Sequence, residues 1–219
     1  MMKVRWYIGA LALAAVVSCS DEEDILPQQQ EKIVSYLTNS HTPRLLSEQD
    51  AAESLDNDPP YYSAFGNTAY RYIADVYNSE RPARPEVVEG SLIDVTFELY
   101  DFSAYQTPRQ VDCVYSNDTV VINRLVGLGL DPRYWVECDA EGVPVIDEDG
   151  QYVPNALTLR IGDGAVLSGL HEAFIGCREQ DKVEIYMTYN QAYGEKLIVG
   201  LIPKESPVAF FCTINKVTR

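Results

Sequence analysis

The stretch that decides the fold lies in the last third of the chain, where residues 157–176 read LTLRIGDGAVLSGLHEAFIG and residues 182–194 read KVEIYMTYNQAYG. Runs of β-branched, aromatic and other apolar residues predict strands, and Gly-rich segments predict turns. The expected elements are strands at 157–161, 182–189 and 208–217, a Gly turn at 162–164 and a short apolar helix at 166–176. Leu201-Ile202-Pro203 precedes the last strand.

Upstream of this stretch, residues 92–100 alternate apolar and polar side chains, which predicts a half-buried strand. Residues 110–115 are expected to form another strand, and residues 118–130 a helix that ends before Asp131-Pro132. The segment 137–155 mixes acids, Gly and Pro and predicts a long loop or hairpin. Its carboxylates are the oxygen ligands that calcium prefers, but they lack the spacing of an EF-hand loop, so a solvated acidic loop is the favoured interpretation.

Residues 31–83 are predicted to be a helical and Tyr-rich N-terminal extension of the domain. Residues 31–37 fit a short amphipathic helix, and residues 47–55 fit a second helix that Asn57-Asp58-Pro59-Pro60 ends. The segments 61–62 and 70–77 are rich in Tyr and other strand formers. These Tyr side chains suit a sugar or peptide platform, although half-buried strands also use Tyr commonly, and packing is favoured.

The N-terminus has the features of a lipoprotein signal peptide. Lys3 and Arg5 precede an apolar run from Trp6 to Val17, which is shorter than the roughly 20 residues that a membrane-spanning helix needs. Val16-Val17-Ser18-Cys19 resembles the lipobox of bacterial lipoproteins, which implies cleavage after residue 18 and acylation of Cys19. Several acyl chains would anchor the protein without a spanning helix.

Residues 19–30 are predicted to be an acidic, Gln-rich tether. Ser20-Asp21-Glu22-Glu23-Asp24 resembles the export signal that sends Bacteroidota lipoproteins to the outer face of the outer membrane, and it equally fits a solvated spacer. We expect a protein of the cell envelope, lipid-anchored to the outer membrane and either periplasmic or surface-exposed.

The charge of the chain excludes nucleic acid as a partner. The chain has 17 Lys and Arg against 33 Asp and Glu, for a net charge of −16. Cleavage after residue 18 removes Lys3 and Arg5 and no acid, so the mature chain would carry −18. Binding to the phosphates of a duplex needs clustered Lys and Arg, which this sequence lacks.

The cysteines and histidines point to structure rather than catalysis. Cys113, Cys138, Cys177 and Cys212 fit no zinc or redox spacing, and in an exported protein they allow one or two disulfides. The chain has only two His, which disfavours a His-based metal site or a catalytic triad.

The C-terminal pattern resembles the FKBP-type peptidyl-prolyl isomerases, whose closing half reads strand, Gly turn, V-I-x-G helix, strand, A-Y-G, Gly loop, I-P and a last strand with an early Phe. The corresponding residues here are Val166-Leu167-Ser168-Gly169, Ala192-Tyr193-Gly194, Ile202-Pro203 and Phe210. The match runs from Leu157 to the end, and weaker similarity extends back to Gly90. The resemblance implies an α+β domain over residues 84–219, in which an antiparallel sheet of about five strands wraps around a short helix.

The resemblance also implies the site, position by position. Tyr193 would hold the peptide through its hydroxyl, Leu167 would donate its backbone N–H to the carbonyl beside the proline, and Asp112 would be the pocket carboxylate. Asp112 also fits a turn residue at the end of a strand. The substrate pocket would consist of Phe97, Val111, Leu157, Val166, Leu170, Ala192, Ile198, Ile202 and Phe210. No cofactor and no metal are implied.

Three features depart from the family pattern. Leu170 stands where the family commonly has the Trp at the floor of the pocket, and Leu157 stands where an aromatic residue is usual. We therefore expect a less aromatic and shallower pocket. The chain also has a large insertion at about residues 116–156, which must fold beside or over the pocket.

The expected function is a lipid-anchored, monomeric prolyl isomerase that acts on proline-containing peptides or unfolded exported proteins, with a chaperone contribution from the N-terminal helices. Two alternatives remain: a weak or inactive FKBP-fold protein that binds peptides or proteins, and an adhesion or glycan-binding lipoprotein that uses the Tyr-rich segment. Fold alone does not decide among them.

Overall fold

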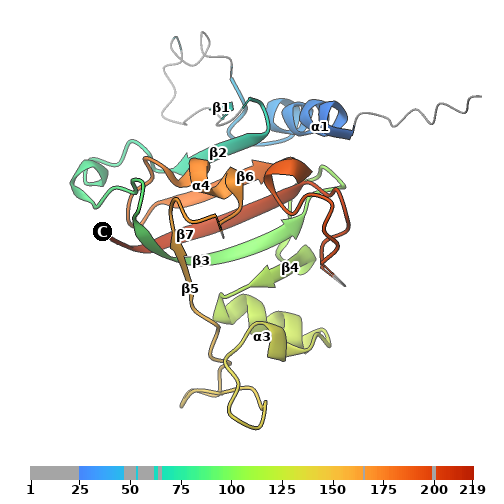
Figure 1. Cartoon of the computed structure of the whole chain (residues 1–219), viewed down its shortest axis with the longest axis vertical. Helices are drawn as coiled ribbons and strands as arrows, with labels where there is room; N and C mark the ends of the chain where they lie inside the picture. The colour runs from blue at the N-terminus through green and yellow to red at the C-terminus, as the bar shows by residue number, and fades with distance from the viewer. Residues whose placement is uncertain (1–24, 47–52, 54–61, 64–65, 165, 199–200) are drawn as a thin grey trace, which may run out of the picture.

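The computed structural model describes residues 25–46, 53, 62–63, 66–164, 166–198 and 201–219, and most of its strands lie in one antiparallel sheet (Figure 1). In the described part of the chain the sheet order is β1-β2-β6-β7-β3-β4, and β5 also pairs with β3. The strands are β1 (Tyr62–Ser63), β2 (Ala69–Ala74), β3 (Leu92–Asp101), β4 (Cys113–Ser116), β5 (Leu157–Arg160), β6 (Lys182–Met187) and β7 (Val208–Thr218). The helices are α1 (Ile25–Asn39), α3 (Thr119–Gly127) and α4 (Ser168–Phe174), with 3₁₀ turns at Arg81–Ala83, Gln110–Asp112, Pro132–Tyr134 and Tyr189–Gln191.

The expected α+β fold is confirmed, and the N-terminal extension enlarges the sheet. β2 pairs with β6 from Ala69 to Ala74, so the Tyr-rich segment is an edge of the sheet rather than a separate unit. The strand ends at Ala74, and Asp75 turns the chain with a φ of 54°. Tyr70 is fully buried, as the packing interpretation predicts, whereas Tyr77 is exposed.

One face of the sheet holds the core of the domain. β3 buries Val95, Phe97 and Leu99 on this face, in agreement with the alternation of its sequence. The ring of Phe97 stacks on Phe210 of β7 at 5.1 Å, and Phe174 of α4 meets Phe210 edge-on at 6.3 Å. Burial of each such ring contributes about 1.5–3 kcal/mol, so α4 is held firmly in the curve of the sheet.

Gly169 lets α4 approach the sheet closely. A Cβ atom at this position would lie 2.5 Å from Sδ of Met187 on β6. Since real Cβ atoms do not come so near another heavy atom, a larger residue here would require the Met187 side chain to move. The Gly of the short helix therefore has a packing role.

The other face of the sheet is partly covered by α1. Ile33, Tyr36 and Leu37 are buried there, and the ring of Tyr36 lies 5.0 Å from Phe102 and 5.6 Å from Tyr186. The helix begins at Ile25, so residues 25–30 are helical and not part of a tether as the sequence suggested. The reason is that Gln29 is also buried against the domain. Cys19 and the helix expected at residues 47–55 lie outside the described residues, apart from Glu53, which is helical.

The insertion forms α3 and an exposed arm at the end of the molecule opposite α1 (Figure 1). Asp118 caps α3 by accepting hydrogen bonds from the N–H groups of Val120 and Val121. The arm, residues 136–154, folds back on itself through paired segments, which fits the expected loop or hairpin. Asp139 and Asp147 each accept two backbone N–H groups within their own turns, so these carboxylates shape the arm.

Two further expectations differ from the structure. Residues 110–112 form a 3₁₀ turn, and the strand that pairs with β3 covers residues 113–116 rather than 110–115. The four cysteines of the described chain are free thiols, three of them buried, so the disulfides that the sequence allowed are not formed.

Candidate functional site

An apolar hollow of about 240 Å³ opens where three parts of the chain meet. One wall is Leu99 of β3 and Tyr115 of β4, a second is Trp135 of the insertion, and the third is the segment between β6 and β7. The residues of this third wall are Tyr193, Ile198, Leu201 and Ile202. All seven side chains are aliphatic or aromatic, so the hollow suits an apolar group of a ligand.

The third wall belongs to a folded loop, residues 189–198 and 201–206, which we call the pocket loop. Its backbone bonds to itself: Gly194 N donates to the Tyr189 carbonyl at 2.8 Å, and Glu205 N donates to the Gly194 carbonyl at 3.0 Å. Gly194 has a φ of 61°, a conformation that glycine adopts without strain. The Ala-Tyr-Gly motif therefore makes the turn that presents Tyr193 to the hollow.

Tyr193 and Tyr115 bring two phenol groups to the hollow. Burial, with a smaller contribution from the nearby Tyr115, raises the pKa of Tyr193, and burial also raises the pKa of Tyr115. Both hydroxyls are therefore protonated at neutral pH. Neither is hydrogen-bonded to another residue in the part of the chain that the structure describes. Each can donate a hydrogen bond to a ligand carbonyl.

Trp135 forms an aromatic wall of the hollow that was not predicted from the sequence. It follows the 3₁₀ turn at Pro132–Tyr134, its carbonyl accepts from Asn155 N at 2.9 Å, and its ring lies 6.4 Å from Tyr115. The side chain is 3% exposed, and its indole Nε1 has no hydrogen-bond partner among the described residues. The insertion thus folds beside the hollow, and the expectation of a less aromatic site is wrong for this wall.

The expected floor of the pocket is part of the core. Phe97, Leu170 and Phe210 are 4–5% exposed and pack together beneath the sheet. Leu157 packs against the same cluster and pairs with Val95 across the β3–β5 ladder. Of the residues expected in the pocket, Tyr193, Ile198 and Ile202 do line the hollow.

A second, more polar hollow of about 430 Å³ lies on the other side of the Ala192–Tyr193 turn. Val166, Leu167 and Ala192 line it together with Asp163, Ser168, His171 and Lys196. Leu167 precedes α4, and its carbonyl accepts from Leu170 N and His171 N at 3.0 and 2.9 Å. The Leu167 N–H has no backbone acceptor among the described residues.

Val111 and Asp112 lie away from both hollows, which corrects their assignment to the pocket. The Val111 side chain is 53% exposed. Asp112 accepts from Nε and Nη2 of Arg109 at 2.7 and 2.9 Å, and this guanidinium lowers the pKa of the carboxyl. Both residues sit in the 3₁₀ turn before β4, so the position on β4 that faces the apolar hollow falls at Tyr115.

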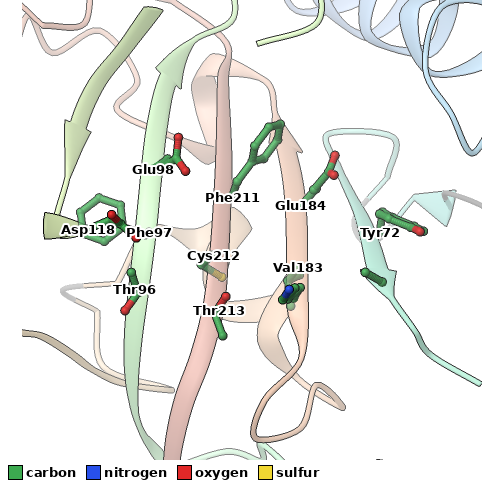
Figure 2. Close-up of a pocket in the computed structure, with 12 residues that line it drawn as sticks. Tyr72, Thr96, Phe97, Glu98, Asp118, Val183, Glu184, Phe211, Cys212 and Thr213 are labelled. Atoms are coloured by element: carbon green, nitrogen blue, oxygen red, sulfur yellow. The ribbon is translucent and has the colours of Figure 1, made fainter. Parts of the chain in front are cut away.

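The opposite face of the sheet carries a shallow depression of about 270 Å³. Figure 2 shows Tyr72, Glu184, Phe211 and Glu98 across its four neighbouring strands. Glu184 contacts His41 at 3.1 Å, and Glu98 accepts from the Tyr100 hydroxyl, so both carboxylates are engaged within the protein. We place the candidate site at the apolar hollow, which has unengaged donors.

Sequence reasoning missed Leu99, Tyr115, Trp135 and Leu201. The alternation of β3 puts Leu99 on the face of Phe97 and could have found it. No local signal marks Trp135, because its place depends on how the insertion folds. Within the described residues, no group of three His, Cys, Asp or Glu side chains is arranged to hold a metal ion. Nor is any described helix both long and apolar enough to cross a membrane.

This chain is similar to known proteins over parts of its length. No curated protein matches it. Among solved structures, the three FKBP domains of wheat FKBP73 share 11% identity with a TM-score of 0.44, over 70% of this chain and 48% of that chain. The chain thus spans about half the length of the wheat protein. The N-terminal domain of FKBP42 from Arabidopsis thaliana shares 7% identity with a TM-score of 0.44, over 76% of this chain and 98% of that chain. Residues 139–215, which include the pocket loop and α4, match the model of the family described as FKBP-type peptidyl-prolyl cis-trans isomerase.

Proposed function

We propose that the protein is a peptidyl-prolyl cis-trans isomerase that rotates X-Pro bonds in exported proteins. The observation that supports this most is the apolar hollow beside Tyr193, one wall of which, the pocket loop, lies within the region that matches the family. Its volume of about 240 Å³ is below the roughly 300–1,000 Å³ of sites for drug-sized ligands, which fits a single prolyl ring.

Rotation about an X-Pro bond requires no covalent bond between the protein and its substrate. Rotation about the X-Pro bond faces a barrier of about 18–20 kcal/mol, because resonance gives the C–N bond double-bond character. The twisted amide has a smaller dipole than the planar one. An apolar, water-poor wall therefore favours the twisted state, provided that fixed donors hold the flanking carbonyls during rotation.

The residues of the two hollows have distinct roles in this proposal. The prolyl ring lies in the apolar hollow against Ile202 and Trp135. The hydroxyls of Tyr193 and Tyr115 donate hydrogen bonds to peptide carbonyls on one side, and the N–H of Leu167 donates a hydrogen bond on the other. Because the phenol pKa values are raised, these two donors keep their protons at neutral pH. No proton is transferred in the reaction.

The cellular setting belongs to the same proposal. Acylation at Cys19 anchors the protein to the outer membrane, either in the periplasm or at the surface, where proline-containing peptides and unfolded exported proteins are its substrates. The protein acts as a monomer, and the N-terminal region adds a chaperone contribution. Metabolic labelling with an alkyne palmitate tests the anchor: a Cys19→Ala variant would lose the label.

Peptide binding and catalysis can be measured separately in this chain. The sequence has two Trp, Trp6 and Trp135, so full-length protein with Trp6→Phe reports Trp135 fluorescence alone. Saturation with a short Leu-Pro peptide is expected to change the emission of Trp135, and the matched Leu-Ala peptide is not. The same protein is expected to accelerate cis-trans exchange of the Leu-Pro peptide.

A binding protein without catalysis is the second candidate. The observation that favours it is that Phe97, Leu170 and Phe210 are closed into the core, so the hollow is bounded by other residues than the pattern implied. A change in Trp135 emission without acceleration would support this candidate. The absence of both effects would contradict both candidates.

A further inference from the structure

The N-terminal helix reaches the pocket loop through one buried polar side chain. Gln29 of α1 is 4% exposed. Its Nε2 donates to the Glu205 carbonyl at 2.6 Å, and its Oε1 accepts from Tyr189 N at 2.9 Å. Both functional groups of the amide are thus used, and both partners belong to the pocket loop.

The two partners of Gln29 are near the opposite ends of that loop. Tyr189 follows β6, and Glu205 precedes β7. Gly194 joins them from inside the loop, because its N–H donates to the Tyr189 carbonyl and its carbonyl accepts from Glu205 N. Gln29 therefore closes a hydrogen-bonded circuit around the base of the turn that carries Tyr193.

The helix that bears Gln29 is itself held on the sheet. Ile33 and Leu37 are fully buried, and Tyr36 packs on Phe102 and Tyr186. A buried amide is costly unless both its donor and its acceptor are satisfied, and among the described residues the pocket loop satisfies both. The position of the loop is thus coupled to the docking of α1.

We infer that Gln29 is a positioning residue: it holds the two ends of the pocket loop so that Tyr193 and Ile202 face the apolar hollow. This inference rests on the proposed function for its catalytic consequence, but its structural consequence is measurable without activity. It also means that the site is built partly from the N-terminal extension, since the residues that match the family begin only at 139.

The test compares full-length wild type with Gln29→Met, which keeps the length of the side chain and removes both hydrogen bonds. Gln30→Met is the matched control, because Gln30 lies next along the same helix and donates to the Gly66 carbonyl at a long 3.4 Å, away from the loop. Amide hydrogen exchange is followed in the pocket loop and, as reference, in β3 and β7.

In Gln29→Met, exchange is expected to accelerate about tenfold at Tyr189, whose N–H loses its acceptor, and at Gly194 and Glu205, whose N–H groups bond within the released loop. The strands β3 and β7 should keep their protection. In the isomerase assay KM is expected to rise about fivefold with kcat within about twofold. The reason is that a displaced loop weakens the binding of the substrate and of the transition state equally. Gln30→Met should match wild type in both measurements.

Unchanged exchange in the pocket loop of a folded Gln29→Met protein would overturn the inference. Gln29→Glu serves if the Met variant does not fold, since it keeps the acceptor for Tyr189 N and loses the donor to the Glu205 carbonyl. Because this releases the end of the loop, exchange at the Glu205 N–H, which donates to the Gly194 carbonyl, must then accelerate. Its failure to do so overturns the inference. If wild type has no isomerase activity, the proposed function fails while the exchange data still decide the role of Gln29.

Discussion

Two regions far apart in the sequence form facing walls of the apolar hollow, and they differ in how their positions arise. The pocket loop belongs to a stretch whose order of strands, glycines and helix is regular, and Tyr193 lies where that order places it. Trp135 comes from the insertion between β4 and β5, which has no counterpart in the pattern. The comparison teaches that an aromatic wall can come from another element when its usual position on α4 is taken by Leu170.

The largest expected effect is at the wall made by the insertion. Trp135→Ala removes a nearly fully buried ring and is expected to lower the free energy of unfolding by about 3–5 kcal/mol. Urea denaturation measures this loss. Leu128→Ala, at an exposed site of the same insertion, should change stability by less than about 0.5 kcal/mol. Equal effects of the two changes would mean that the insertion does not pack at the hollow.

A Trp at the position of the short helix is expected to destabilise rather than to restore a pocket. Leu170 is 5% exposed within the core, so Leu170→Trp overpacks it and costs about 1–3 kcal/mol. Leu170→Met, of similar volume, should cost less than about 1.5 kcal/mol. Thermal unfolding checks both. A stable Leu170→Trp protein with higher isomerase activity would show that the pocket extends to α4 after all.

Two buried thiols outside these regions, Cys113 and Cys177, predict instability at high pH. Burial raises the pKa of Cys113 on β4 to about 12 and that of Cys177 after α4 to about 11, from 9.0. Above pH 9 the unfolded chain loses these protons first, so their contribution is complete below pH 9 and is lost as pH rises through 11 and 12. At pH 10 the expected loss is about 1 kcal/mol for each thiol.

Chemical denaturation between pH 8 and 10.5 measures this slope. Cys177→Ala should reduce it relative to wild type, whereas Cys138→Ala, at an exposed thiol, should leave it unchanged. An equal slope in both variants would show that Cys177 is not shielded from solvent.

The smallest effect distinguishes a residue that faces the hollow from one that does not. Tyr193→Phe removes one hydroxyl that has no hydrogen-bond partner among the residues the structure describes, so stability should stay within about 0.5 kcal/mol. The value of kcat/KM should fall about fivefold, the worth of one hydrogen bond. Asp112→Asn, the matched change at the corrected position, should leave kcat/KM within about twofold. Steady-state isomerisation kinetics compare them, and a larger loss in Asp112→Asn would reverse the correction.

The elements of the fold were largely predictable from local patterns. The alternation of β3, the capping of α3 by Asp118 and the order of β5, α4, β6 and β7 follow from spacing alone. The site was predictable only in part: Tyr193, Ile198 and Ile202 line the hollow, whereas Asp112 does not. The 3₁₀ turn before β4 moves the start of the strand from residue 110 to residue 113, so Asp112 does not reach the pocket. Such a turn has no clear signature in sequence.

The sequence by itself determined which residues face the core, because apolar side chains with period two or at helical spacing can be buried together only on one face of an element. It also determined the turn that presents Tyr193, since Gly194 accepts a backbone conformation that other residues rarely adopt. Only the tertiary structure decided that Trp135 forms a wall of the hollow and that Gln29 holds both ends of the pocket loop. These contacts join residues separated by tens to more than a hundred positions, and their geometry depends on the packing of whole elements rather than on any local preference of the chain.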